Sequence, residues 1–274
     1  METILAPTDF SSGSVNAVTY AANLSRLFSA KLILFHAYHT PVTSLEGGYI
    51  PPLIDMKIES EEQMQKLEKE IKNSFPDVEI DVCLKMGLAA DVIEEVAKEK
   101  NIDLIVMGIT GQNNIVKEHL IGSVASKVAV ESTIPVLIVP EKVKYTKIKN
   151  LAYACDLDKD LEQNSVLIKV KYFSTIFSAE LKILNVMKPN EEISEVKALI
   201  DSYVEERLKT TNHNSFFIYD EKVDKGLLEY LDHDNVDIIV TCPKKHNFFH
   251  NIFVESNTKK LVFNSPIPIL TIHS

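Results

Sequence analysis

The chain contains no tryptophan, only three cysteines and only eight glycines among its 274 residues. Cys83, Cys155 and Cys242 are odd in number and far apart, so a disulfide framework is excluded and we expect reduced, mostly buried thiols. No tract reaches the roughly 18 apolar residues of a membrane span, and the start lacks the basic and apolar regions of a signal peptide. We therefore expect a cytoplasmic protein with no membrane partner.

Basic patches are also missing. The formal net charge is −10, and neither half of the chain is basic. Binding to a phosphate backbone normally needs a stripe of lysine and arginine with interleaved aromatic residues, which this sequence does not contain. Nucleic acid is therefore not an expected partner.

The sequence does contain an internal repeat. Three segments recur in the same order in the second half of the chain: 28–32 as 177–181, 101–106 as 235–240, and 132–138 as 265–271. Because the order is kept, each half is expected to be a complete structural unit. A polar, lysine-rich stretch at 141–150 separates them, which predicts domains at 1–143 and 144–274.

Short apolar runs alternate with helical spacing in the first half. The predicted strands are 3–7, 31–37, 78–85, 104–107 and 135–139. Helices are expected between them, the first capped by Ser12 or Ser14. Alternation of this kind predicts an α/β fold in which each half is a five-stranded parallel sheet with helices on both faces. A ligand would bind beyond the carboxyl ends of the strands.

Glycines follow the fourth predicted strand. Gly108 and Gly111 come directly after it, and Gly122 and Ser123 open the next helix. Glycines let backbone N–H groups approach a phosphate, and a helix start adds free donors and partial positive charge. The alternative is that they only form a turn, since neither of the two common glycine-rich phosphate-binding patterns is present.

These residues resemble the universal stress protein family in its tandem two-domain form. ATP-binding members carry G-x2-G-x9-G-[ST] after the fourth strand, whereas here ten residues, not nine, separate Gly111 from Gly122. The segments 4–11, 87–93, 122–128 and 134–139 are also similar to the family's signatures, although 87–93 lacks the family's proline. The resemblance implies a Rossmann-like fold of the adenine nucleotide alpha hydrolase-like kind, with the two domains forming a pseudo-dimer.

The resemblance also implies a nucleotide site in the first half, for ATP with or without Mg²⁺. Asp9 matches an aspartate that contacts adenosine, and Ala37 matches a position whose backbone meets adenine. The alternative for Asp9 is a carboxylate that caps the helix or stabilises the loop. The full set of implied binding residues is Pro7, Asp9, Ala37, Met107, Gly108, Gly111, Gly122, Ser123 and Val124.

The second half departs from this pattern. Asp156 takes the place of Asp9, but Cys242 and Lys245 replace the first two glycines, and Glu255 stands opposite Gly122. A carboxylate at that point would repel phosphate. We predict that the second half does not bind ATP by this route.

Cys242, His246 and His250 have C-x3-H-x3-H spacing, and thiolate with imidazole suits zinc. A histidine-containing loop beside a buried cysteine is the favoured alternative, so zinc is not an expected cofactor.

No set of residues argues for catalysis. Phosphoryl transfer needs a positioned metal, a cation at the γ-phosphate and an oriented nucleophile, and the motif supplies only Lys117, Lys127 and a loop histidine, His119. Three functions remain: a nucleotide-binding regulator of the stress response with an unidentified protein partner, a nucleotide-independent scaffold, and a slow ATPase. The strands at 136–139 and 269–272 are candidates to pair within the chain, and a further homodimer is plausible from the family.

Overall fold

The computed structural model describes residues 1–38, 53–109, 123–155, 164–189, 204–242 and 265–273. The chain divides into two compact units, Met1–Tyr145 (unit 1) and Thr146–Ser274 (unit 2). No helix in the described residues is both long and apolar enough to cross a membrane.

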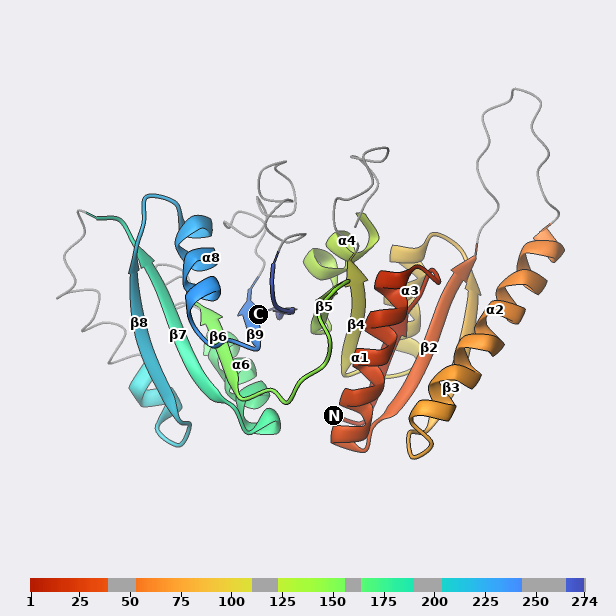
Figure 1. Cartoon of the computed structure of the whole chain (residues 1–274), viewed down its shortest axis with the longest axis horizontal. Helices are drawn as coiled ribbons and strands as arrows, with labels where there is room; N and C mark the ends of the chain where they lie inside the picture. The colour runs from red at the N-terminus through yellow and green to blue at the C-terminus, as the bar shows by residue number, and fades with distance from the viewer. Residues whose placement is uncertain (39–52, 110–122, 156–163, 190–203, 243–264, 274) are drawn as a thin grey trace, which may run out of the picture. The chain divides into compact units, whose positions relative to one another are not determined.

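Unit 1 is a five-stranded parallel sheet in the order β3-β2-β1-β4-β5. The strands are β1 (Thr3–Pro7), β2 (Lys31–Tyr38), β3 (Ile80–Met86), β4 (Leu104–Ile109) and β5 (Val136–Pro140). The helices are α1 (Ser12–Phe28), α2 (Leu53–Ser74), α3 (Ala89–Glu99) and α4 (Ser123–Glu131). Right-handed crossovers put α1 and α2 on one face of the sheet and α3 and α4 on the other (Figure 1).

Burial explains why these segments form strands. Every residue of β5 is buried, as is nearly every residue of β1 and β4, because helices cover both faces of the sheet. The direction of the strand order reverses between β1 and β4, and the carboxyl ends of these strands form the switch point where ligands of such sheets bind.

The predicted cap of α1 was wrong by one to three residues. The cap is Ser11, whose backbone is extended and whose Oγ accepts a hydrogen bond from the Ser14 N–H at 3.3 Å. Ser12 and Ser14 already lie inside the helix, so their backbones cannot take the extended conformation that a cap needs. Phe10 precedes the cap with φ 63°, a left-handed conformation that is rare for a bulky residue.

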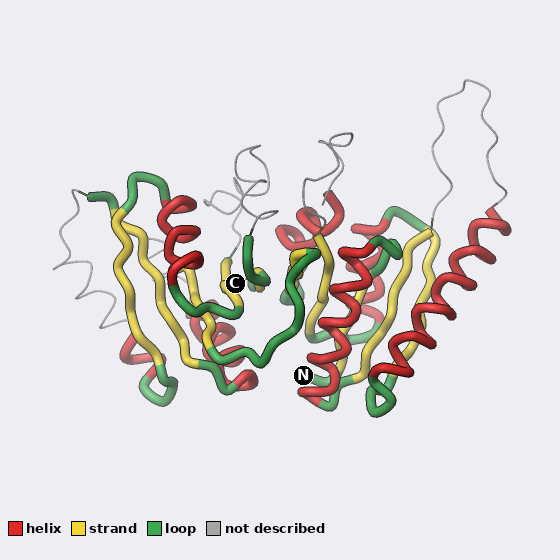
Figure 2. The backbone as a smooth tube through the Cα atoms, in the orientation of Figure 1, coloured by secondary structure: helices red, strands yellow, loops and turns green. Residues whose placement is uncertain are grey.

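Unit 2 repeats the same sheet, in the order β8-β7-β6-β9-β10, again parallel throughout. Figure 2 shows the strands of each unit in yellow with helices in red against them. The expected α/β fold with two five-stranded parallel sheets is therefore confirmed. The pairing of the last strands into a pseudo-dimer stays a prediction. The described elements are β6 (Asn150–Ala154), α6 (Asn164–Phe177), β7 (Glu180–Met187), β8 (His213–Tyr219), α8 (Val223–His233), β9 (Ile238–Thr241) and β10 (Ile269–Thr271).

Candidate functional site

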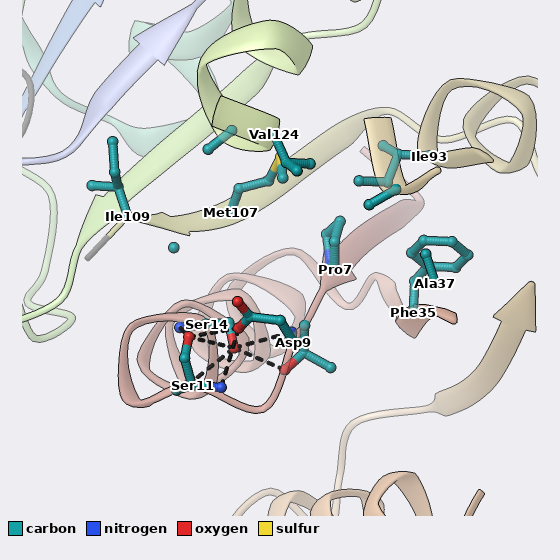
Figure 3. Close-up of a pocket in the computed structure, with 14 residues that line it drawn as sticks. Pro7, Asp9, Ser11, Ser14, Phe35, Ala37, Ile93, Met107, Ile109 and Val124 are labelled. Carbon is teal, nitrogen blue, oxygen red and sulfur yellow. Dashed lines mark hydrogen bonds between the residues drawn. The ribbon is translucent and has the colours of Figure 1, made fainter. Parts of the chain in front are cut away.

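A pocket opens at the switch point of unit 1. Its floor is formed by the carboxyl ends of β1, β2 and β4, and its walls by the first turns of α1, α3 and α4 (Figure 3). Most of the lining is apolar. The described lining residues are Pro7, Thr8, Asp9, Ser11, Ser14, Phe35, Ala37, Ala89, Ile93, Met107, Gly108, Ile109, Val124 and Ala125.

Asp9 is the one charged side chain among these described residues. Its Oδ1 accepts hydrogen bonds from the Ser11 N–H at 3.1 Å and from Ser11 Oγ at 2.5 Å. Partial burial of the carboxyl raises its pKa, but hydrogen bonds from Ser11, Ser14 and the backbone outweigh this effect, and the pKa of Asp9 is lower than usual. The group is therefore an ionised acceptor at the edge of the pocket, suited to a hydroxyl donor.

Hydroxyl groups hold the turn that carries Asp9. Thr8 Oγ1 and Ser14 Oγ lie 2.9 Å apart, and both residues are buried. The backbone N–H groups of Asp9 and Phe10 donate to Ser14 Oγ at 3.3 Å and to Thr8 Oγ1 at 3.0 Å. This network fixes the strained turn and orients the carboxylate without a ligand.

The start of α4 lies on the other side of the pocket. Figure 3 shows Val124 and Met107 across the hollow from the cluster of Asp9, Ser11 and Ser14. A helix start attracts anions, whereas an ionised carboxylate repels them. The pocket can therefore accept an elongated ligand whose hydroxyl groups meet Asp9 and whose anionic end points toward α4.

Gly108 is needed for packing as well as for the pocket. A Cβ at this position would lie 2.3 Å from the Gly13 carbonyl oxygen and 2.8 Å from the Ser14 backbone nitrogen. The first turn of α1 therefore rests directly on β4. This contact gives Gly108 a structural role that the sequence pattern alone did not indicate.

Unit 2 has larger side chains at two strand positions of the α1 face. Tyr153 and Cys242 take the places of Ala6 and Gly108, and both larger side chains are buried. Larger buried side chains on these strands thus accompany the loss of the glycine pattern in unit 2.

The structure brings six of the nine implied residues to one pocket: Pro7, Asp9, Ala37, Met107, Gly108 and Val124. Ser123 begins α4, while Gly111 and Gly122 lie outside the described residues, as do Lys117 and His119. Lys127 is held by Asp91 of α3 at 2.8 Å.

Sequence reasoning missed several lining residues. Thr8, Ser11 and Ser14 were not assigned to the site, although their hydroxyls directly follow the end of a buried strand and could have been noticed there. Ile93 of α3 gave no such signal, because its spacing is that of any buried helical residue.

The metal candidates fall mostly outside the described residues. Cys242 is buried just after β9, but the structure does not describe His246 and His250. Within the described ranges, no group of three or more histidine, cysteine, aspartate or glutamate side chains could hold a metal ion. Zinc at C-x3-H-x3-H therefore stays an untested alternative.

Known proteins resemble this chain in sequence and in fold. The family model described as the universal stress protein family matches residues 1–140. Two universal stress proteins of Methanocaldococcus jannaschii are 33% identical over 144 residues (52% of this chain and 83% of the relative) and 28% identical over 154 residues (51% and 94%). The crystal structure of a universal stress protein from Archaeoglobus fulgidus covers 99% of this chain and 96% of its own, with TM-score 0.73 and 17% identity.

Proposed function

We propose that this chain, which belongs to the universal stress protein family, binds an adenine nucleotide in unit 1 and acts as a nucleotide-dependent regulatory protein. ATP, with or without Mg²⁺, is the nucleotide that the family's glycine pattern implies. Binding would favour one conformation or one partner over another by the difference in nucleotide affinity between the two states.

The observation that carries the proposal is the division of the pocket into three parts. Ionised Asp9 suits the hydroxyls of a ribose, and the apolar walls around Ala37 and Ile93 suit a base. The start of α4, opposite Asp9, suits a phosphate group. An apolar wall, an ionised acceptor and a helix start around one pocket match the base, ribose and phosphate of a nucleotide better than they match an apolar ligand or a sugar.

The lining of the pocket favours a regulatory role over ATP hydrolysis. The described lining residues include no lysine, arginine or histidine, so they supply no cation for a γ-phosphate, and their one carboxylate, Asp9, lies across the pocket from the start of α4. Unit 2 has a buried cysteine in place of Gly108, and we propose that it does not bind nucleotide through the equivalent route.

The first test is the identification of any nucleotide that copurifies. Mass analysis of material released from the purified chain, followed by titration with ATP, ADP and AMP, is expected to reveal binding of at least one of them. If nothing copurifies and no titration saturates, the proposal fails and the scaffold alternative stands. Steady ADP formation above that of a Gly122→Val variant would instead support the ATPase alternative.

Asp9→Asn is expected to weaken nucleotide binding about tenfold, because a hydrogen bond to a charged group is worth about 1.5–3 kcal/mol. The amide oxygen can still accept the Ser11 hydrogen bonds, so the turn is kept. Asp156→Asn, the same change at the equivalent position of unit 2, is the matched control and is expected to leave the affinity unchanged. Gly122→Val is expected to remove binding, and equal affinity in all three variants would refute the assigned site.

A further inference from the structure

A second pocket lies at the end of β2, on the α2 side of the sheet. Successive residues of a strand face opposite sides, so Phe35 lines the nucleotide pocket while His36 and Tyr38 line this second one, which we call the α2 pocket. Ala37 borders both. Phe10 contributes from the turn after β1, and Met56, Glu59 and Gln63 contribute from α2.

The polar groups of the α2 pocket are mostly acceptors. His36 Nδ1 lies 2.8 Å from the Thr8 carbonyl oxygen and must donate to it, which leaves Nε2 of a neutral ring as an acceptor. Glu59 Oε1 accepts from the Gln63 amide at 3.2 Å, so its carboxylate has further lone pairs. The Ser60 hydroxyl donates to the Met56 carbonyl at 2.8 Å and is thus engaged within the helix.

Aromatic rings form one wall of the α2 pocket. The Phe10 and His36 rings pack with centroids 4.5 Å apart and planes tilted by 38°. The left-handed backbone of Phe10, held by the Thr8 hydroxyl, keeps its ring in this position. A ring face attracts cations, most strongly when they are planar and weakly hydrated.

The electrostatic surroundings are negative. The described lining residues of the α2 pocket include Glu59 and no lysine or arginine. Within the first part of α2, Asp55, Glu59, Glu61 and Glu62 outnumber the single base Lys57, which pairs with Glu61 at 3.6 Å. Such a surface concentrates cations and disfavours anions.

We propose that the α2 pocket binds an organic monocation of the alkylguanidinium type. A guanidinium offers five N–H donors in a flat fork, which meets the acceptors of Glu59, His36 and Tyr38 while its plane stacks on the aromatic wall. Its alkyl stem would contact Met56. The site is distinct from the nucleotide pocket, and its occupancy does not require a nucleotide.

The test is a titration of the full chain, labelled with ¹³C at the methionine methyl groups, with butylguanidinium. The methyl signal of Met56, assigned by its absence in Met56→Leu, is expected to shift and saturate with a dissociation constant of about 30 mM, the strength of an exposed ion pair combined with a cation–π contact. Butylurea, which has nearly the same shape but no charge, is expected to produce no saturable shift. Equal responses to the two compounds, or no saturation with butylguanidinium, would overturn the proposal.

Glu59→Gln tests the carboxylate, with Glu62→Gln as its matched control. Both residues are exposed on α2, but Glu62 does not line the pocket, so both variants should fold and lose the same charge. Glu59→Gln is expected to weaken butylguanidinium binding about three- to fivefold, and Glu62→Gln by less than about twofold. If the two substitutions weaken binding equally, the cation responds only to general charge, and the assigned site is wrong.

Discussion

Gly108→Ala is expected to destabilise unit 1 by at least about 2 kcal/mol, the upper part of the range for inserting a methyl group into a packed interior. The new Cβ would lie 2.3 Å from the Gly13 oxygen and 2.5 Å from its carbonyl carbon. Both are backbone atoms, so no side chain can rotate away, and the first turn of α1 must move off β4. Because the chain has no tryptophan, urea unfolding should be followed by circular dichroism.

Gly226→Ala in unit 2 is the control for this prediction. The three atoms nearest to its Cβ would be side-chain atoms of Asp220, Ile218 and Val186, at 3.1–3.2 Å. Alanine also gains about 1 kcal/mol of helix propensity over glycine within α8. The net change is expected to stay within about 1 kcal/mol. Equal stability of the two variants would contradict the direct seating of α1 on β4.

The role of Gly108 shows where sequence reasoning stops. The order of strands and helices could be predicted, because buried parallel strands give continuous apolar runs and each helix keeps its own spacing. The contact between Gly108 and Gly13 joins residues far apart in the chain and depends on the distance between a helix and a sheet. No local pattern encodes that distance, so the sequence pointed only to ligand approach or to a turn at this glycine, and not to helix packing.

The strand-end residues of the candidate site could be predicted, but the hydrogen bonds within the site could not. The family resemblance implied Pro7, Ala37 and Met107, and these residues lie at one pocket because parallel strands bring their carboxyl ends together. The hydrogen bonds from Ser11 to Asp9 could not be assigned, because a carboxylate near a helix start has several local donors to choose from.

Unit 2 contains an ion pair with a buried lysine at a position where the sequence repeat would suggest an apolar residue. Lys182 of β7 is buried, and its Nζ lies 2.5 Å from Asp234 Oδ1 and 3.1 Å from the Asn235 carbonyl oxygen. The ammonium also lies 5.8 Å from the centre of the Phe216 ring. The equivalent residue of unit 1 is Ile33, so unit 2 has an ion pair where unit 1 has an apolar core.

Asp234→Asn is expected to destabilise unit 2 by about 2 kcal/mol at pH 7. Removing one partner of a buried ion pair costs about 3–5 kcal/mol. The cost is expected to be smaller here, because the Asp234 side chain is 34% exposed and the new amide oxygen can still accept the Lys182 hydrogen bond. The measurement is again urea unfolding. Lys225→Met is the control, because Lys225 is 70% exposed and lies 3.6 Å from Asp220, and it should change the free energy of unfolding by less than about 1 kcal/mol.

The pH dependence separates loss of charge from loss of packing. The hydrogen bond from Lys182 holds the pKa of Asp234 below its ordinary value, despite the opposing effect of burial. A carboxyl whose pKa is lower in the folded than in the unfolded protein stabilises the fold when it is ionised. Its full contribution to the free energy of unfolding is present above the unfolded-state pKa of about 3.9, and this contribution is lost as the pH falls through the folded-state pKa. The gap between wild type and Asp234→Asn should therefore stay constant from about pH 5 to 8 and shrink below about pH 4. A gap that persists unchanged at pH 3 would show that the aspartate stabilises unit 2 by shape rather than by its charge beside Lys182.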